Sequence, residues 1–254
     1  MGIGPEWKLR EHLLAEDAKA PPIELSLSLS EEQTNGAHQT FSRVPQPVGD
    51  FADWNELVQT IQSCMRCDLS LTRTKTVPGV GDIQADWLFV GEGPGRDEDR
   101  QGEPFVGRAG QLLDNMLRAL GIQRNENIYI ANIVKCRASD KDKKDRRPTE
   151  EEAAQCMPYL QWQIQKIRPK IIVALGNTAA AALLNTDRSV NMTAMRSKVH
   201  RLEVNGASIP VVVTYHPAYL LRTTIAKKQA WADLCLAMDT FESLQDPSIL
   251  NKGY

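Results

Sequence analysis

The sequence predicts an α/β fold: a single three-layer α/β/α sandwich around a short, mainly four-stranded parallel sheet, with an N-terminal appendage. Four short apolar runs have the length and flanks of buried strands, at residues 87–90, 128–134, 171–175 and 209–214. Helical patterns separate these runs, and strands that alternate with helices form parallel sheets covered on both faces. Ligands of such sheets bind beyond the carboxyl ends of the strands, so the residues after each run are the candidates for a site.

The expected helices follow from apolar periodicity and from capping signals. Residues 110–120 place Leu113 and Leu117 on one face of an amphipathic helix. A further helix over 149–167 begins with Thr149 and has Glu152 three positions later, a capping box that satisfies free amides at a helix start. Three more helices are expected over 51–63, 176–184 and 225–244.

The composition is that of a protein with a sizeable core, because 42% of the 254 residues are hydrophobic. No apolar stretch approaches the roughly 18–20 residues of a membrane span, and the N-terminus shows no secretory signal pattern. We therefore expect a cytoplasmic protein that is a monomer and has no membrane partner.

Residues 1–50 are expected to be a poorly ordered N-terminal extension or linker, and residues 51–254 to be the main folded domain. The first 50 residues carry four basic and eight acidic side chains, whereas the rest of the chain carries 26 and 24. A short helix is an option over 5–20. The apolar–polar alternation over 23–30 suits a short edge strand or a segment that binds a protein partner. The mildly positive body is compatible with a basic groove for nucleic acid.

Four cysteines predict a metal or cluster site. Cys64 and Cys67 form a C-x2-C pair, and Cys136 and Cys156 follow some seventy residues later. A reducing cytoplasm disfavours a disulfide framework, and four thiolates suit either an iron–sulfur cluster or zinc. The fifth cysteine, Cys235, lies in a helix-like apolar run and is expected to be a small buried hydrophobe.

A glycine-rich loop with four acidic residues follows the first apolar run, over residues 91–99. Gly91 and Gly93 suit a backbone that turns sharply and approaches a ligand closely. A nucleotide-phosphate loop is disfavoured, because the chain lacks G-x-x-x-x-G-K-[ST] and Arg96 interrupts the G-x-G-x-x-G pattern. The acidic side chains would also repel phosphates.

Polar side chains that could take part in binding or catalysis lie at the ends of the other expected strands. Asn132 stands near the end of the second run, and His216 directly follows the fourth. An imidazole beside an amide and a carboxylate can hold a planar polar heterocycle and stabilise charge that develops on it. Phe105 is either a stacking surface for that ring or a core residue.

Five motifs in this order resemble family 4 of the uracil-DNA glycosylase superfamily, its iron–sulfur type. The motifs are GEGPG with the acidic residues after it, EPFVGRAGQLL, NIVKCR, ALGNTAA and HPAYLLR. The resemblance covers roughly residues 64–231 and leaves out residues 1–50. It implies a DNA repair enzyme that binds single- or double-stranded DNA containing uracil and flips the uracil out of the stack. The enzyme would then hydrolyse the N-glycosidic bond and leave an abasic site.

The resemblance also implies roles in base binding. Phe105 would stack on the uracil, Asn132 would read its polar edge, and His216 would stabilise the departing uracil anion. The main chain of the glycine-rich loop would complete the pocket, at Gly91, Glu92 and Gly93.

The water-handling carboxylate would be Glu92 or Glu98, and we favour Glu92. The superfamily's best-known branch has the motif G-Q-D-P-Y, in which an aspartate stands at the position of Gly93 and a tyrosine at that of Gly95. That tyrosine excludes the thymine methyl group, so thymine rejection must come from elsewhere here, with Glu98 as the candidate.

On the DNA side, the resemblance implies that Leu220 fills the vacated stack and that Arg222 contacts phosphate. The four cysteines would hold a [4Fe–4S] cluster of structural role, with zinc as the alternative. The charged loop 138–148 is either solvated surface or a phosphate contact, through Lys143, Lys144, Arg146 and Arg147.

Three rival interpretations are disfavoured. One branch of the superfamily traps DNA covalently through a histidine in this loop, but the chain has no histidine between His38 and His200. A non-catalytic nucleic-acid-binding protein would not need the full set of polar residues at the strand ends. An iron–sulfur redox protein would need a redox partner or substrate, for which the sequence gives no sign.

Overall fold

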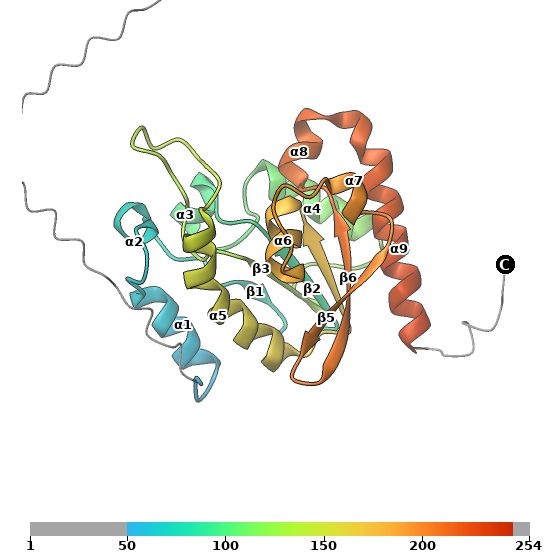
Figure 1. The fold of residues 1–254 in the computed structure, drawn as a ribbon, viewed down its shortest axis with the longest axis horizontal. Helices are drawn as coiled ribbons and strands as arrows, with labels where there is room; N and C mark the ends of the chain where they lie inside the picture. Colours follow the sequence, from blue (N-terminus) through green and yellow to red (C-terminus); the bar gives the residue numbers. More distant parts are fainter. Residues whose placement is uncertain (1–49, 246–254) are drawn as a thin grey trace, which may run out of the picture. The chain divides into compact units, whose positions relative to one another are not determined.

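A six-stranded mixed sheet forms the centre of the computed structural model, which describes residues 50–245 (Figure 1). The strands are β1 (Val80–Gly81), β2 (Trp87–Gly91), β3 (Ile128–Asn132), β4 (Ile171–Leu175), β5 (Val199–Val204) and β6 (Ala207–Thr214). Their order in the sheet is β1-β3-β2-β4-β6-β5. The four central strands run parallel to one another, and β1 and β5 are antiparallel at the two edges.

The α/β class and the four central parallel strands confirm the sequence prediction. Strands β2, β3 and β4 are buried along their whole length, as continuous apolar runs indicate. The two edge strands were not predicted. Strand β1 has only two residues, too few for a pattern, and β5 alternates between exposed and half-buried positions because it borders a single neighbour.

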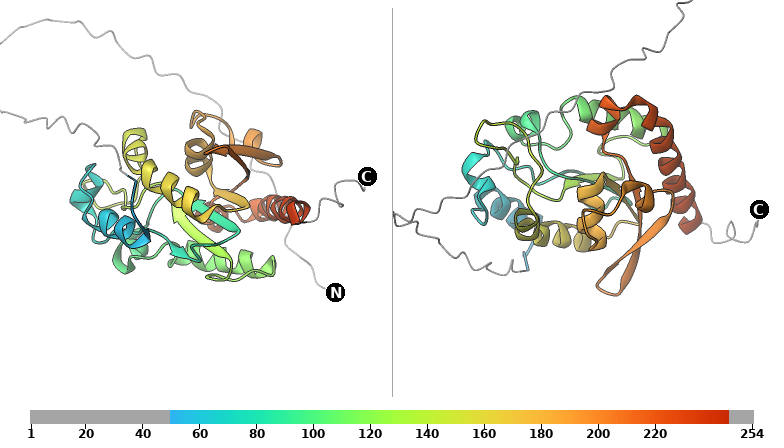
Figure 2. Two further views of the ribbon diagram at one scale, coloured as in Figure 1. Left: turned by 90° about the horizontal axis from the view of Figure 1, so that it is seen from below. Right: turned by 45° about the horizontal axis from the view of Figure 1, so that its top comes forward.

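Helices cover both faces of the sheet and make it the middle of three layers. The helices are α1 (Trp54–Ser63), α2 (Leu69–Thr72), α3 (Arg96–Gln101), α4 (Arg108–Ala119), α5 (Glu150–Ile167), α6 (Asn177–Leu184), α7 (Met192–Met195), α8 (Pro217–Arg222) and α9 (Lys227–Gln245), with a 3-10 turn η1 (Thr224–Ala226). Helices α1, α5 and α6 pack on one face in one hydrophobic cluster, and α4 and α9 pack on the other. Figure 2 shows α5 and α4 on opposite sides of the strands.

The capping box expected at the start of α5 is present. The Thr149 hydroxyl accepts from the Glu152 amide, and the Glu152 carboxylate accepts from the Thr149 amide. This cap fixes where α5 begins, and so it fixes the position of Cys156 two turns along the helix.

Several expectations concern residues outside the part of the chain that the structure describes, and they stay predictions. The option of a helix over 5–20, the alternating segment 23–30 and the division at residue 50 fall on or next to residues 1–49, which lie outside the described part. Among residues 50–245, none of the helices is both long and apolar enough to cross a membrane.

Candidate active site

An open pocket of about 320 Å³ lies at the carboxyl ends of the parallel strands. Glu92 in the loop after β2, Asn132 at the end of β3 and His216 after β6 line its wall, together with Phe105. A wider groove of about 920 Å³ adjoins the pocket. Glu92 and His216 line both spaces, so they stand at the boundary between the pocket and the groove.

Asn132 offers the pocket an amide that the rest of the protein leaves unused. Its side chain is 1% exposed, and its Oδ1 has no hydrogen-bond partner within residues 50–245. Gly91 is its neighbour in the paired strand, where a Cβ would stand 2.4 Å from that Oδ1. A buried polar atom without a partner is costly unless a ligand or water satisfies it. Gly93 lines the pocket, whereas Gly91 is not among its lining residues.

The backbone of Phe105 is held in an unusual conformation. Its φ angle is 54°, in the left-handed region that non-glycine residues rarely adopt. Arg124, paired with Asp114, donates to the carbonyls of Pro104 at 3.0 Å and of Phe105 at 2.8 Å. At Gly110 a Cβ would lie 1.7 Å from the Phe105 oxygen. This strained and well-supported backbone aims the ring into the pocket wall, 5.5 Å from the ring of His216.

Glu98 stabilises the segment around Phe105 through hydrogen bonds to main-chain amides. One carboxylate oxygen accepts from the amides of Val106 at 3.0 Å and Gly107 at 2.9 Å, and the other accepts from the Gly95 amide at 3.1 Å. Both oxygens are therefore engaged in holding the loops around Phe105. Its placement favours a positioning role over the catalytic role considered from the sequence.

His216 caps α8 and has a defined tautomer. Its Nδ1 accepts a hydrogen bond from the Ala218 amide at 3.1 Å, so the neutral ring carries its proton on Nε2. Burial, with a smaller contribution from the positive charge of Arg222, lowers the pKa of His216 to about 4. At pH 7 the ring is neutral, and its Nε2–H is available to a ligand in the pocket.

We expect the imidazole of His216 to stay neutral on acidification to about pH 4. Because the folded-state pKa lies below that of the unfolded chain, about 6.5, the unfolded state takes up the proton first. The stability that the neutral ring contributes is present above pH 6.5 and is lost as the pH falls toward 4. NMR titration of the ring measures this pKa, and a midpoint near 6.5 would contradict the assignment.

Glu92 receives a hydrogen bond that the sequence did not reveal. The Thr178 hydroxyl, in the first turn of α6, donates to its Oε2. Thr178 stands in the ALGNTAA motif, but no role was assigned to it. Its position could have indicated a role, because Thr178 follows β4, and β4 pairs with β2, the strand that ends beside Glu92.

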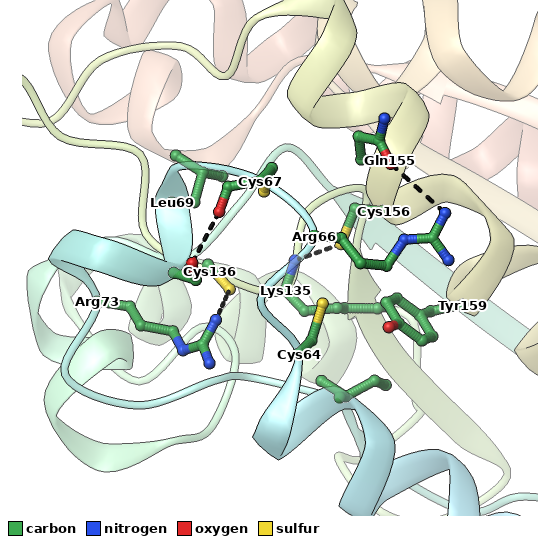
Figure 3. A pocket seen from close by; sticks show the side chains of 12 residues that line it. Cys64, Arg66, Cys67, Leu69, Arg73, Lys135, Cys136, Gln155, Cys156 and Tyr159 are labelled. Carbon is green, nitrogen blue, oxygen red and sulfur yellow. Dashed lines mark hydrogen bonds between the residues drawn. The ribbon is translucent and has the colours of Figure 1, made fainter. Parts of the chain in front are cut away.

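Four cysteines from three segments line one small cavity (Figure 3). Cys64 and Cys67 follow α1, Cys136 follows β3, and Cys156 belongs to α5. Burial raises the pKa of the Cys136 thiol to about 11 and that of Cys156 to about 12. Cys235 lies apart in α9 and is only partly buried.

The surroundings of the cysteines are positively charged. Arg73 donates to the Cys136 sulfur at 3.2 Å, and the Lys135 amide donates to the Cys156 sulfur at 3.2 Å. Arg66 also lines the cavity, and its lining residues include no carboxylate. Thiolates in this cavity would therefore meet cations and donors, which fits a negatively charged group held by four sulfurs. Within the described part of the chain, no three His, Cys, Asp or Glu side chains are grouped as ligands of a single metal ion.

The family model of the uracil DNA glycosylase superfamily matches residues 78–236. This span contains the pocket residues from Glu92 to His216 and two of the four cysteines. The chain belongs to the uracil-DNA glycosylase superfamily. Cys64 and Cys67 precede the matched span.

Several relatives within the superfamily are type-4 uracil-DNA glycosylases. A type-4 uracil-DNA glycosylase of Archaeoglobus fulgidus is 44% identical over 169 residues, which cover 66% of this chain and 82% of that protein. That of Thermotoga maritima is 44% identical over 164 residues, covering 65% and 81%. That of Pyrobaculum aerophilum is 37% identical over 186 residues, covering 72% and 92%. The resemblance to family 4 expected from the motifs is thus confirmed.

Leu220, the residue expected to fill the vacated stack, is only 1% exposed in this structure and packs with Ala226 and Ala230. Proline at the first position of α8 fixes the helix start, and Leu220 then falls on its inner face. Tyr219 and Leu221 on the same helix are 38% and 36% exposed.

Three of the arginines considered as phosphate contacts line the wide groove, namely Arg146, Arg147 and Arg222. Arg222 lies there beside Tyr219. Arg146 is occupied, because its guanidinium binds both oxygens of Glu152, at 2.6 and 2.8 Å.

Proposed function

We propose that this protein is a uracil-DNA glycosylase that takes a flipped uracil into the pocket and hydrolyses its bond to deoxyribose. The observation that carries the proposal is the unpartnered amide of Asn132, buried beside Phe105 and the neutral imidazole of His216. Family membership and the type-4 relatives support it.

Base recognition is assigned to the inner pocket. The Asn132 carboxamide presents one acceptor and two donors, which complement the N–H and carbonyl groups on the edge of uracil. Phe105 supplies an apolar face on which a planar ring can stack. Cytosine carries an amino group in place of one carbonyl, so it would pair poorly with an amide fixed in this orientation.

The scissile bond is assigned to the boundary between the pocket and the groove. A base in the inner pocket is joined to a sugar in the outer groove, so the bond between them must pass Glu92 and His216. When this bond breaks, its electron pair moves onto uracil N1, the oxygen of a water bonds to C1′ of the sugar, and one proton of that water is released to solvent. The Nε2–H of His216 donates to a uracil oxygen as negative charge develops. The Glu92 carboxylate orients the water and stabilises positive charge on the sugar.

The four cysteines are assigned to a [4Fe–4S] cluster. Four cysteines line one small cavity between α1, the loop after β3 and α5, and four thiolates suit such a cluster, with zinc as the alternative. The role of the cluster here would be structural, since it would join these three segments. The cluster carries net negative charge, which Arg66, Arg73 and Lys135 would balance.

The DNA is assigned to the wide groove, with Arg222 and Arg147 as phosphate contacts. The exposed Tyr219 and Leu221, rather than Leu220, are the side chains of α8 placed to meet a distorted duplex. Monomeric state and a protein partner for residues 1–50 remain part of the proposal.

A variant of Glu92 tests the catalytic assignment. Replacing Glu92 by glutamine removes the negative charge but keeps the shape, and we expect uracil release to slow about a hundredfold. The assay uses an oligonucleotide with one central uracil, followed by alkali to break abasic sites, with a thymine oligonucleotide alongside. The exposed Glu103→Gln is the matched control and should retain the wild-type rate.

Two results would count against these assignments. Full activity of Glu92→Gln would move water handling to another group. Lack of uracil-dependent scission by the wild-type protein, with its cluster intact, would overturn the proposed function itself.

A further inference from the structure

We propose that Thr178 is a positioning residue that fixes the orientation of the Glu92 carboxylate for glycosidic-bond cleavage. This inference rests on the proposed function and deepens it. It rests on one side-chain hydrogen bond, from the Thr178 hydroxyl in the first turn of α6 to Glu92 Oε2 in the loop after β2.

The hydroxyl is held by a rigid frame. Thr178 is 4% exposed and stands in the first turn of α6, immediately after β4. Strands β2 and β4 are hydrogen-bonded neighbours, with Val90 paired to Ala174. The donor and the acceptor, 86 residues apart in the sequence, are thus each only a few residues beyond a fixed point of the sheet. Groups held by strands and helix starts are placed more accurately than groups on free loops.

Glu92 needs such a partner because little else restrains it. The carboxylate is half-buried at the mouth of the wide groove and forms no ion pair with any residue in the 50–245 region. A glutamate side chain that is free to change rotamer loses conformational entropy whenever it must reach one orientation. A hydroxyl that fixes the rotamer before the substrate arrives removes that cost from the reaction.

The hydrogen bond also leaves the carboxylate chemically available. Only Oε2 is engaged by Thr178, so Oε1 remains for water or for the developing positive charge. Glu98 in α3, the helix after that loop, provides the contrast, because main-chain amides engage both of its oxygens. The two carboxylates therefore have different roles: Glu98 holds main-chain amides, whereas Glu92, oriented by the Thr178 hydroxyl, keeps one oxygen for the reaction.

Two substitutions at this position separate the hydroxyl from the shape of the side chain. Thr178→Val keeps the volume and removes the hydroxyl, and Thr178→Ser keeps the hydroxyl. Under single-turnover conditions with a uracil oligonucleotide, we expect Val to lower the cleavage rate about tenfold, the effect of one lost hydrogen bond. The enzyme concentration that gives half of the maximal cleavage rate should stay close to that of the wild type, and so should the melting temperature. Ser should recover the rate to within about threefold, and the exposed Thr186→Val is the matched control.

A double-mutant cycle distinguishes positioning of Glu92 from a separate contribution. If Thr178 acts through the carboxylate, Thr178→Val should cause little further loss in a Glu92→Gln background. Three results would overturn the inference: cleavage by Thr178→Val at the wild-type rate, equal impairment of Thr178→Ser and Thr178→Val, or fully additive losses in the double mutant. In each case, uracil release by the wild-type protein would still uphold the proposed function. A wild-type protein that releases no uracil would overturn both.

Discussion

Replacing Asn132 by alanine is expected to slow uracil release about a thousandfold. The amide is the buried polar group that the protein leaves unpartnered in the pocket, so its hydrogen bonds are made to the base. Sites built around hydrogen bonds to a substrate lose several orders of magnitude when those bonds cannot form. Single-turnover cleavage of a uracil oligonucleotide measures the effect.

The control for this variant is Asn115→Ala on the exposed face of α4, which should cleave at the wild-type rate. Circular dichroism and the melting temperature verify that both variants fold. An Asn132→Ala protein that is folded and cleaves uracil within threefold of wild type would show that the base is read elsewhere.

Replacing Cys156 by serine is expected to remove the cluster and to destabilise the domain. A serine oxygen is a poor ligand for iron, and the cluster would join three segments that otherwise meet around a cavity. We expect iron and acid-labile sulfide to fall to a small fraction of the wild-type content. The melting temperature should fall by about 10 °C, which corresponds to about 3 kcal/mol in a domain of this size.

Cys235→Ser is the matched control, because Cys235 lies in α9 away from the four-cysteine cavity. It should keep its iron, its visible absorption and a melting temperature within a few degrees of wild type. A Cys156→Ser protein with undiminished iron content would refute the assignment of Cys156 as a ligand. Equal losses of iron and of melting temperature in both variants would indicate that the protein is sensitive to any cysteine replacement, and would not support a cluster at the four cysteines.

The central sheet could be predicted because buried parallel strands have local signatures. Strands β2, β3 and β4 are continuous apolar runs between helical patterns, and the rule that ligands bind beyond strand ends then pointed to Asn132 and His216. The short edge strand β1 has no such signature. It exists because β3 offers an unpaired edge.

The features that escaped prediction depend on contacts between distant residues. The bond from Thr178 to Glu92 and the support of Phe105 by Arg124 join segments that no periodicity relates. The burial of Leu220 likewise depends on how α8 packs against η1 and the start of α9. Glu98 was recognised as important for its charge, whereas its hydrogen bonds to three amides indicate that it shapes the loop.

The most direct test of the account is mass-spectrometric detection of the free base released from a duplex that contains one uracil. The account predicts one equivalent of uracil for each abasic site from the wild-type protein, no thymine from a matched duplex, and almost no uracil from His216→Ala or Asn132→Ala. Release of no base by the wild type, or release at the wild-type rate by both variants, would contradict the claim that this pocket excises uracil.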